Sequence, residues 1–315
     1  MNKSKKTLAE ESGNQSTLVI KLGALGDMVQ AVPLFDVIRQ QFGDSLTLLT
    51  TKPFVDFAER TGYFKTIICD DRTSMKTTLR MLLDLRKMSF KRIIDAQNVD
   101  RTNLYRLLLS TRSTQWITTS CKNRHPYHRY KQLCANQGWS APSIVDLRRL
   151  AEPINLPKSP CVLIVAGASN AKGGLKKWPQ ENYAALCRRL MDKGITPVLI
   201  GSNADNLSQL QTLCAENYVG LTNKTVDLIG QTSLYQLITL GMHAIGAIGN
   251  DTGPLLMIAA TGCSTLTLFS KVNPPNKGGA WPWDDRHRSI YAENLNGLSI
   301  DDVWQKMRFC KDEPH

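Results

Sequence analysis

Short apolar runs alternate with helical patterns along this chain, and the alternation occurs twice within its 315 residues. Continuous apolar runs are typical of strands buried on both faces, as in parallel sheets whose helices lie in the connections between strands. The sequence therefore predicts an α/β protein with two doubly wound parallel sheets, whose ligands bind in a cleft outside the carboxyl ends of the strands. Strands are expected at residues 17–21, 46–50, 66–69, 92–95, 162–165, 196–200, 226–229, 244–248 and 265–269.

A stretch rich in proline and polar residues, 140–160, leads to the linker between the two halves. We expect a polar tail at 1–16, an N-terminal domain at 17–155 and a C-terminal domain at 156–315. The last helix, 300–310, can pack on either half. The other helices are expected at 31–42 (after a loop at 22–30), 53–61, 77–88, 102–109, 179–193, 204–216, 232–240 and 255–261.

The composition is that of an ordinary globular protein, with 42% hydrophobic and 21% charged residues. No apolar run reaches the length of a membrane span, and the polar residues 1–16 lack the apolar core of a secretory signal. The eight cysteines are scattered without a CxxC pair, which predicts free, buried thiols of a cytoplasmic protein, with Cys69, Cys161 and Cys263 in apolar runs. The formal net charge of +12 favours an anionic partner.

Residues 249–254, Gly-Asn-Asp-Thr-Gly-Pro, join the expected strand at 244–248 to an apolar helix. Pro254 suits the first turn of that helix, and Asp251 or Thr252 can cap it. Free N–H groups at such a helix start suit a phosphate. The same residues also suit an ordinary capped turn without a ligand.

The loop after the first strand, 21–27, contains Gly23, Gly26 and Asp27. Glycine lets the backbone turn tightly and approach a ligand closely. The Asp27 carboxylate at this strand end can take a proton from an attacking hydroxyl, and it can equally cap a helix. The loop matches neither the dinucleotide fingerprint nor the P-loop.

Two strand-end loops of the second half carry polar groups. The first loop, 167–179, contains Ser169, Asn170 and the neighbouring ammonium groups of Lys176 and Lys177, which together can neutralise a diphosphate. The alternative is a solvated basic loop. The second loop, 201–206, contains Asp205, which can accept bonds from ribose hydroxyls or cap a helix.

The segment 122–131 is basic and aromatic. It can bind acidic groups of an acceptor, or it can be a solvated helix face. Its His125 and His128 lack a third ligand at a suitable spacing, so no metal site is expected. The candidate acceptor contacts in this segment are Lys122, Arg124, His125 and Arg129.

Taken together in this order, the motifs make the chain resemble glycosyltransferase family 9, the ADP-heptose:lipopolysaccharide heptosyltransferases. The resemblance runs from residue 17 to about residue 270. Any one piece is weak, and the ordered set is fairly specific. The matching pieces are 21–27 (KLGALGD), 94–98 (IDAQN), 177–179 (KWP), 228–234 (LIGQTSL) and 249–254 (GNDTGP).

This resemblance implies a GT-B fold, with two Rossmann-like domains and the site between them. The N-terminal domain would bind the acceptor and the C-terminal domain the nucleotide sugar. It also implies an inverting, metal-independent transfer of a heptose from ADP-heptose to the inner core of lipopolysaccharide, without a cofactor. Asp27 matches the general base. The implied donor contacts are Ser169, Asn170, Lys177, Asp205, Asp251, Thr252, Gly253 and Pro254. Further candidate acceptor contacts are Gly26, Gln97, Asn98 and Arg101.

One position departs from the family pattern. A histidine usually stands two residues after the Gly-Pro pair, and here that residue is Leu256, which cannot form its hydrogen bond. The alternative function is therefore a non-catalytic or differently specific nucleotide-sugar-binding GT-B protein.

The basic charge fits a monomer that is cytoplasmic and peripheral at the anionic inner face of the cytoplasmic membrane, where its acidic acceptor lies. Such charge also fits nucleic acid. That partner is not expected, because no nucleic-acid-binding motif or aromatic platform is present.

Overall fold

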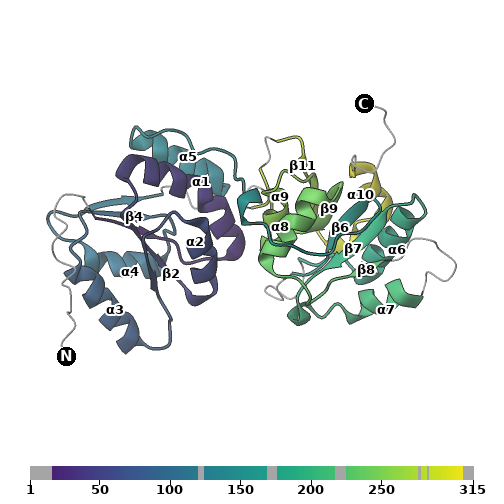
Figure 1. The fold of residues 1–315 in the computed structure, drawn as a ribbon, viewed down its shortest axis with the longest axis horizontal. Coiled ribbons are helices and arrows are strands. Elements are labelled where there is room, and N and C mark those ends of the chain that lie inside the picture. The colour runs from purple at the N-terminus through teal and green to yellow at the C-terminus, as the bar shows by residue number, and fades with distance from the viewer. Residues whose placement is uncertain are drawn as a thin grey trace. The chain divides into compact units, whose positions relative to one another are not determined.

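The computed structural model of the chain describes residues 16–119, 124–168, 176–216, 225–275, 278–281 and 284–307. Two compact units are formed, each around its own parallel sheet. The first contains the described parts of Met1–Gly23, Ala31–Lys122 and Arg129–Pro142, and the second those of Ala24–Gln30, Asn123–His128 and Ser143–His315. The predicted α/β class with two parallel sheets is confirmed (Figure 1). The acceptor and donor roles assigned to the two domains stay predictions.

The sheet of the first unit has the strand order β3-β2-β1-β4-β5, and every pair of neighbours is parallel. Alternate residues of its strands, such as Leu18 and Ile20, pack against buried side chains of α3 and α4. The strands are β1 (Thr17–Ile20), β2 (Leu46–Thr50), β3 (Thr66–Cys69), β4 (Arg92–Asp95) and β5 (Gln115–Thr118). The helices are α1 (Leu25–Phe42), α2 (Val55–Thr61), α3 (Met75–Lys87), α4 (Asp100–Leu109) and α5 (Pro126–Asn136).

The sheet of the second unit has the order β11-β10-β9-β6-β7-β8 and is also parallel throughout. Odd and even residues of β6 belong to different cores: Leu163 packs with α8 and α9, and Ile164 with α6, α7 and α10. Helices therefore cover both faces. The strands are β6 (Cys161–Val165), β7 (Thr196–Ile200), β8 (Val226–Asp227), β9 (Gly246–Asn250), β10 (Thr265–Ser270) and β11 (His287–Ala292). The helices are α6 (Gln180–Met191), α7 (Ser208–Glu216), α8 (Leu234–His243), α9 (Gly253–Ala259) and α10 (Ile300–Lys306).

The structure differs from the sequence analysis in three local features. Helix α1 begins at Leu25 and not at residue 31, so Gly26 and Asp27 lie in its first turn and not in a loop. Strand β11 was not expected, because an edge strand with a half-exposed, polar sequence lacks the continuous apolar run of a central strand. Cys69 is exposed because it ends the edge strand β3, whereas Cys161 and Cys263 are buried free thiols.

The last described helix, α10, packs on α6 in the second unit, with Val303 and Met307 in its core. Among the described helices, none is both long and apolar enough to cross a membrane.

Candidate active site

The second unit has its topological switch point at β6 and β9. These two strands are neighbours, but the chain continues from β6 to β7 on one side and from β9 to β10 on the other. Crevices outside the carboxyl ends of strands at such a point are where open α/β sheets bind ligands. The residues after β6, β7 and β9 form two cavities there that share Thr252 and Pro254. This is the candidate site.

Asn250 fixes the backbone around the switch point. Its side chain is fully buried, its Oδ1 accepts a hydrogen bond from Trp178 N at 3.1 Å, and its Nδ2 donates to Ala166 O at 2.8 Å. One side chain thus joins the end of β9 to the segments after β6 and before α6. Gly249 leaves room for β6, since a Cβ there would lie 2.3 Å from Val165 O. These first two residues of the 249–254 motif are therefore structural, and the sequence did not separate them from the rest.

The first cavity, of about 430 Å³, is lined by Asp27 together with residues 251–254. The start of α1, which belongs to the second unit, supplies Asp27 and also Gly26 and Gln30 to the wall. Lys176 lines the same cavity and interacts electrostatically with Asp251. The cavity therefore combines two carboxylates, an ammonium group and a hydroxyl, which suits charged and hydroxyl-rich ligands.

Asp251 is held by the segment after β10. Its carboxylate accepts hydrogen bonds from the Asn273 side-chain amide and from the backbone of Gly279. Burial raises the pKa of Asp251, and the nearby carboxylate of Asp27 acts in the same direction, whereas Asn273 and Lys176 lower it. Gly279 O also accepts hydrogen bonds from Gln30 Nε2 at 3.2 Å and from His125 Nε2 at 3.1 Å. Asp251, Gln30 and His125 are thus tied to one short segment of the cavity wall.

Thr252 and Asp251 do not cap α9 as the sequence predicts. Thr252 is the N-cap residue in extended conformation, yet neither its side chain nor another makes the capping hydrogen bond. Its Oγ1 is buried without a hydrogen-bond partner among the described residues. A buried hydroxyl of this kind is costly unless something satisfies it. Thr252 lies where the two cavities meet.

The second cavity, of about 460 Å³, lies at the ends of β6 and β7. Asp205 lines it and accepts bonds on Oδ2 from Ser202 N at 2.7 Å and Ser202 Oγ at 2.9 Å. A Cβ on Gly167 would lie 2.4 Å from that oxygen, so the carboxylate lies directly against the backbone after β6. Leu234 and Leu237 give the cavity an apolar side. One carboxylate beside an apolar wall suits a sugar attached to a flat base.

The two lysines of the 167–179 loop differ. Lys177 Nζ donates to the backbone carbonyl of Asp205 at 3.3 Å. Lys176 lines the first cavity, whereas the family resemblance gives Lys177 as the donor contact, which stays a prediction. Adjacent identical residues give no signal that would have distinguished them. Ser169 and Asn170, also expected here, lie outside the described residues.

The expected acceptor contacts belong to both units. Gly26 lines the first cavity and His125 lies behind its wall. Gln97, Asn98 and Arg101 belong to the first unit, and Lys122 lies outside the described residues. Their contact with an acceptor stays a prediction, as it does for the exposed Arg124 and the half-buried Arg129.

The first-unit residues after β4 make definite local contacts. Asp95 is buried, which raises its pKa, and its Oδ1 accepts from Gln97 N and Asn98 N. Gln97 Oε1 accepts from Leu22 N at 3.0 Å, and Asn98 donates to Thr119 O. The 94–98 motif thus orders the end of β4 and the loop after β1. No group of three or more potential metal-ligating side chains occurs in the part of the chain described here.

Comparison with known proteins gives a consistent result. The model of Glycosyltransferase family 9 (heptosyltransferase) matches residues 127–302, more than half of the chain. Lipopolysaccharide heptosyltransferase 2 of Escherichia coli (strain K12) is 30% identical over 105 residues, 32% of this chain and 29% of that protein. Lipopolysaccharide heptosyltransferase 1 of Campylobacter coli is 22% identical over 320 residues, 89% of this chain and 87% of that protein. The chain spans less than a third of the length of the heptosyltransferase 2 proteins that it matches.

Solved structures share the fold. A glycosyl transferase family 9 protein from Veillonella parvula DSM 2008 has a TM-score of 0.74 at 16% identity, covering 94% of this chain and 97% of that one. Escherichia coli ADP-heptose lps heptosyltransferase II has a TM-score of 0.69 at 17% identity, with 94% and 98% covered. Escherichia coli heptosyltransferase WaaC with ADP has a TM-score of 0.68 at 17% identity, covering 94% of this chain and 100% of that one. The predicted GT-B class of two parallel-sheet α/β domains is thereby confirmed.

Proposed function

Because the chain belongs to glycosyltransferase family 9, the heptosyltransferase family, we propose that it transfers a heptose from ADP-heptose to the inner core of lipopolysaccharide. One observation carries the proposal: Asp27 and the 251–254 turn line one cavity, and that turn also lines the neighbouring cavity that contains Asp205. In this proposal, the base, the group that meets the diphosphate and the nucleoside site are contiguous. The names of matched proteins, which include heptosyltransferases and a complex with ADP, support this choice of donor.

The donor occupies both cavities in this proposal. Adenine lies against the apolar side formed by Leu234 and Leu237, and the Asp205 carboxylate accepts a hydrogen bond from a ribose hydroxyl. The diphosphate lies beside Thr252, and the buried Thr252 hydroxyl donates a hydrogen bond to a phosphate oxygen. The heptose lies in the first cavity with Asp27 and Asp251. Ser169, Asn170 and Lys177 remain the proposed donor contacts of the adjoining loop.

The transfer proceeds with inversion and without a metal ion. The acceptor hydroxyl attacks the anomeric carbon from the face opposite the diphosphate, the bond to the phosphate oxygen breaks, and Asp27 takes the hydroxyl proton. Positive charge develops on the sugar ring, as in other glycosyl transfers, and negative charge on the departing ADP. The Lys176 ammonium and the Thr252 hydroxyl stabilise the leaving group from fixed positions. Activity that survives excess chelator is the expected result.

The substitution Asp27→Asn tests the assignment of the base. We expect normal folding and normal ADP binding, measured by thermal shift, but a loss of transfer of about 10²–10⁴-fold. Asp36→Asn is the matched control, because Asp36 lies on the same helix and its Oδ2 accepts a hydrogen bond from Gln40 Nε2 at 2.7 Å. Full activity of the Asp27→Asn variant would remove Asp27 from the mechanism.

Leu256 supports a second candidate, a non-catalytic or differently specific nucleotide-sugar-binding protein. It lines the first cavity, where the family histidine would offer a hydrogen bond and leucine offers methyl groups. A panel of nucleotide sugars separates the two candidates. Release of ADP from ADP-heptose only when acceptor is present supports transfer, whereas a thermal shift without release supports the alternative.

The proposed setting is the inner face of the cytoplasmic membrane, with the protein as a peripheral monomer. The net charge of +12 supports attraction to anionic lipids and to the acidic core of the acceptor. Such attraction weakens as the salt concentration rises.

A further inference from the structure

Exposed apolar side chains gather on two neighbouring helices of the first unit. Met75 is 91% exposed on α3 and Leu107 is 75% exposed on α4. Leu79 and Leu83 on α3 and Leu104 on α4 are exposed as well. In the rest of the described chain, such residues are scattered over several elements. Concentrated apolar exposure of this kind marks a surface that binds something.

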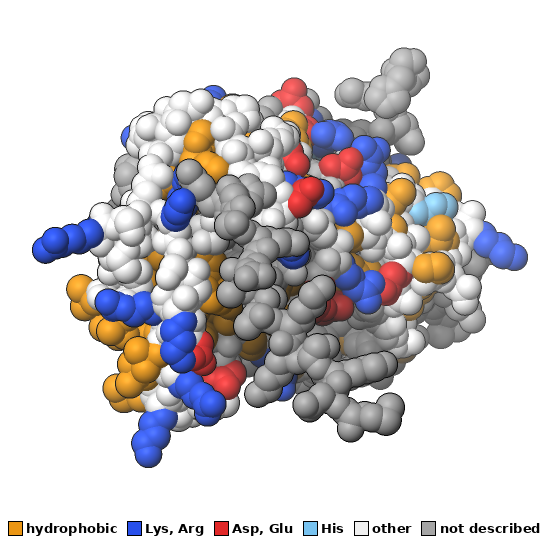
Figure 2. All heavy atoms as spheres, turned by 60° about the vertical axis from the view of Figure 1, so that its left-hand side comes forward, with side chains coloured by type: hydrophobic (Ala, Val, Ile, Leu, Met, Phe, Trp, Pro, Cys, Tyr) orange, Lys and Arg blue, Asp and Glu red, His pale blue; other side chains and the backbone are white. Residues whose placement is uncertain are grey.

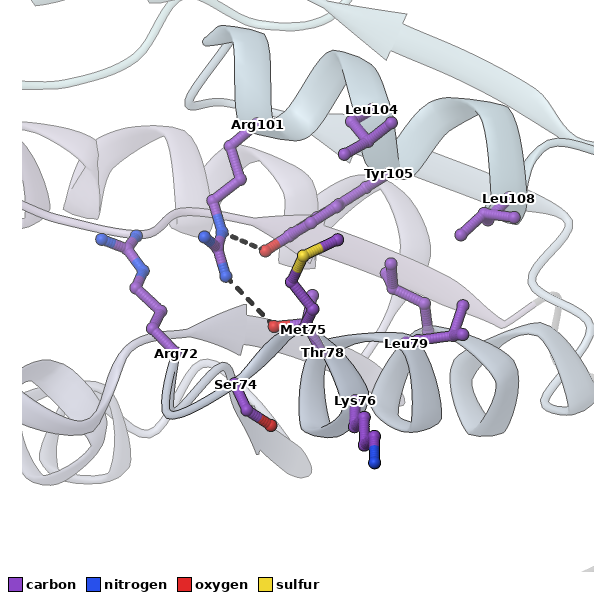
Figure 3. A pocket seen from close by; sticks show the side chains of 11 residues that line it. Arg72, Ser74, Met75, Lys76, Thr78, Leu79, Arg101, Leu104, Tyr105 and Leu108 are labelled. Atoms are coloured by element: carbon purple, nitrogen blue, oxygen red, sulfur yellow. Dashed lines mark hydrogen bonds between the residues drawn. The ribbon is translucent and has the colours of Figure 1, made fainter.

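A groove separates the two helices. It has a volume of about 520 Å³, and its apolar walls come from α3 on one side and α4 on the other. Figure 3 shows Met75 and Leu79 facing Leu104 and Leu108 across it. We call the exposed surface of α3 and α4, with this groove, the α3–α4 face.

Both helices also carry basic side chains. Helix α3 has four basic residues and one acidic residue, and α4 has two and one. Figure 2 shows hydrophobic side chains at the lower left beside several lysines and arginines. The α3–α4 face is therefore both apolar and cationic.

The end of the groove carries charges of both signs. Arg101 holds the buried Asp70 through two bonds of 3.1 Å, and Arg72 lies 3.6 Å from the same carboxylate. The carboxylates of Asp70 and of the exposed Asp71 thus accompany these two guanidinium groups. Arg72 is also one of the few non-glycine residues with a positive φ, at 58°. The excess of positive charge on the α3–α4 face therefore comes from the two helices themselves.

We propose that the α3–α4 face docks on an anionic phospholipid bilayer. The membrane setting of this proposal rests on the proposed function. The leucines and Met75 enter the boundary between headgroups and acyl chains, and the lysines and arginines meet lipid phosphates. Charge decides among the possible occupants. A second copy of the chain would bring the same excess of positive charge and be repelled, whereas anionic lipid is attracted.

Co-sedimentation of the full chain with vesicles tests the proposal. We expect binding to vesicles of phosphatidylcholine with one-quarter phosphatidylglycerol, and weaker binding to phosphatidylcholine alone. The double variant Leu104→Gln, Leu107→Gln should lower partitioning at least about tenfold, because two leucines no longer leave water. The double variant Lys76→Gln, Arg80→Gln should lower it about 25-fold on the anionic vesicles, since each basic residue contributes roughly fivefold.

The matched control is Ile144→Gln with Met242→Gln, two exposed apolar residues of the second unit, and it should bind vesicles as the unchanged protein does. Equal losses in the control and the leucine variant, or no vesicle binding at all, would overturn the proposal. So would a dimer in analytical ultracentrifugation that only the leucine variant abolishes, because the face would then bind a second copy. Transfer to a water-soluble acceptor should be unchanged in every variant. If transfer is absent throughout while vesicle binding follows the expected pattern, the proposed function fails and the docking surface stands.

Discussion

The Cδ1 methyl of Leu256 lies 2.8 Å from the position that a Cβ would occupy on Gly26. The first turn of α1 thus approaches α9 so closely that position 26 has little room for a side chain. The start of α9 is equally close to α1 at Gly253, because a Cβ on Gly253 would lie 2.8 Å from Cβ, Cγ and Cδ2 of Leu25. Both glycines line the first cavity.

We therefore expect Gly253→Ala to be more damaging than Gly26→Ala. The added methyl of Gly253→Ala meets Leu25 near its backbone, which cannot yield, and overpacking of this kind costs about 1–3 kcal/mol. At Gly26 the obstacle is the end of the flexible Leu256 side chain, which can rotate away. Thermal unfolding and ADP affinity of the two variants give the measurement. A larger fall in melting temperature for Gly26→Ala would contradict this order.

The two adjacent lysines should have different kinetic roles. Lys176 lines the cavity, so Lys176→Gln should lower the rate of transfer about 10²-fold or more while ADP still binds. Lys177 donates to the backbone of Asp205, so Lys177→Gln should chiefly weaken ADP binding, several-fold, by loosening that turn. Single-turnover rates and ADP dissociation constants separate the two effects. The reverse pattern would return the leaving-group role to Lys177.

Much of this architecture is readable from the sequence. The strands β1, β2, β6 and β7 are central and fully buried, so their apolar runs stand out. The sequence also indicated the 251–254 turn and Asp27, which line one cavity in the structure, and their roles stay predictions.

Other features depend on contacts that are distant in sequence. Helix α1 starts six residues earlier than expected. The two glycines Gly23 and Gly26 are locally typical of a loop, but Gly26 lies in the helix and allows its close approach to α9. The role of Asn250 depends on Trp178 and Ala166, each more than 70 residues away. No periodicity or local propensity encodes such partners.

Substitution of Arg101 can distinguish a structural role of this residue from a role in acceptor binding. Its guanidinium bonds to the buried Asp70, which also accepts from Tyr105 Oη at 2.7 Å, and burial together with Asp70 raises the pKa of Tyr105 to about 12. Arg101→Gln leaves that carboxylate with fewer donors and should cost about 1–3 kcal/mol of stability. Tyr105→Phe is the companion variant, because it removes one donor to Asp70 and no cation. Both variants should lower the stability. If Arg101 also binds acceptor, only Arg101→Gln should raise the KM for acceptor as well.

His287 should make stability depend on pH. Its ring is buried, with Nδ1 2.9 Å from Thr265 Oγ1, and burial lowers the pKa of His287 to about 4. The unfolded chain therefore binds a proton near pH 6.5 that the folded chain does not bind until about pH 4. The neutral ring stabilises the fold fully above pH 6.5, and this stability is lost as the pH falls toward 4. The difference corresponds to about 3 kcal/mol at most. His287→Gln, which cannot ionise, should lower the melting temperature at pH 7.5 but flatten its fall between pH 6.5 and 4.5. An equally steep fall in both proteins would show that other groups titrate in this range and that His287 does not control it.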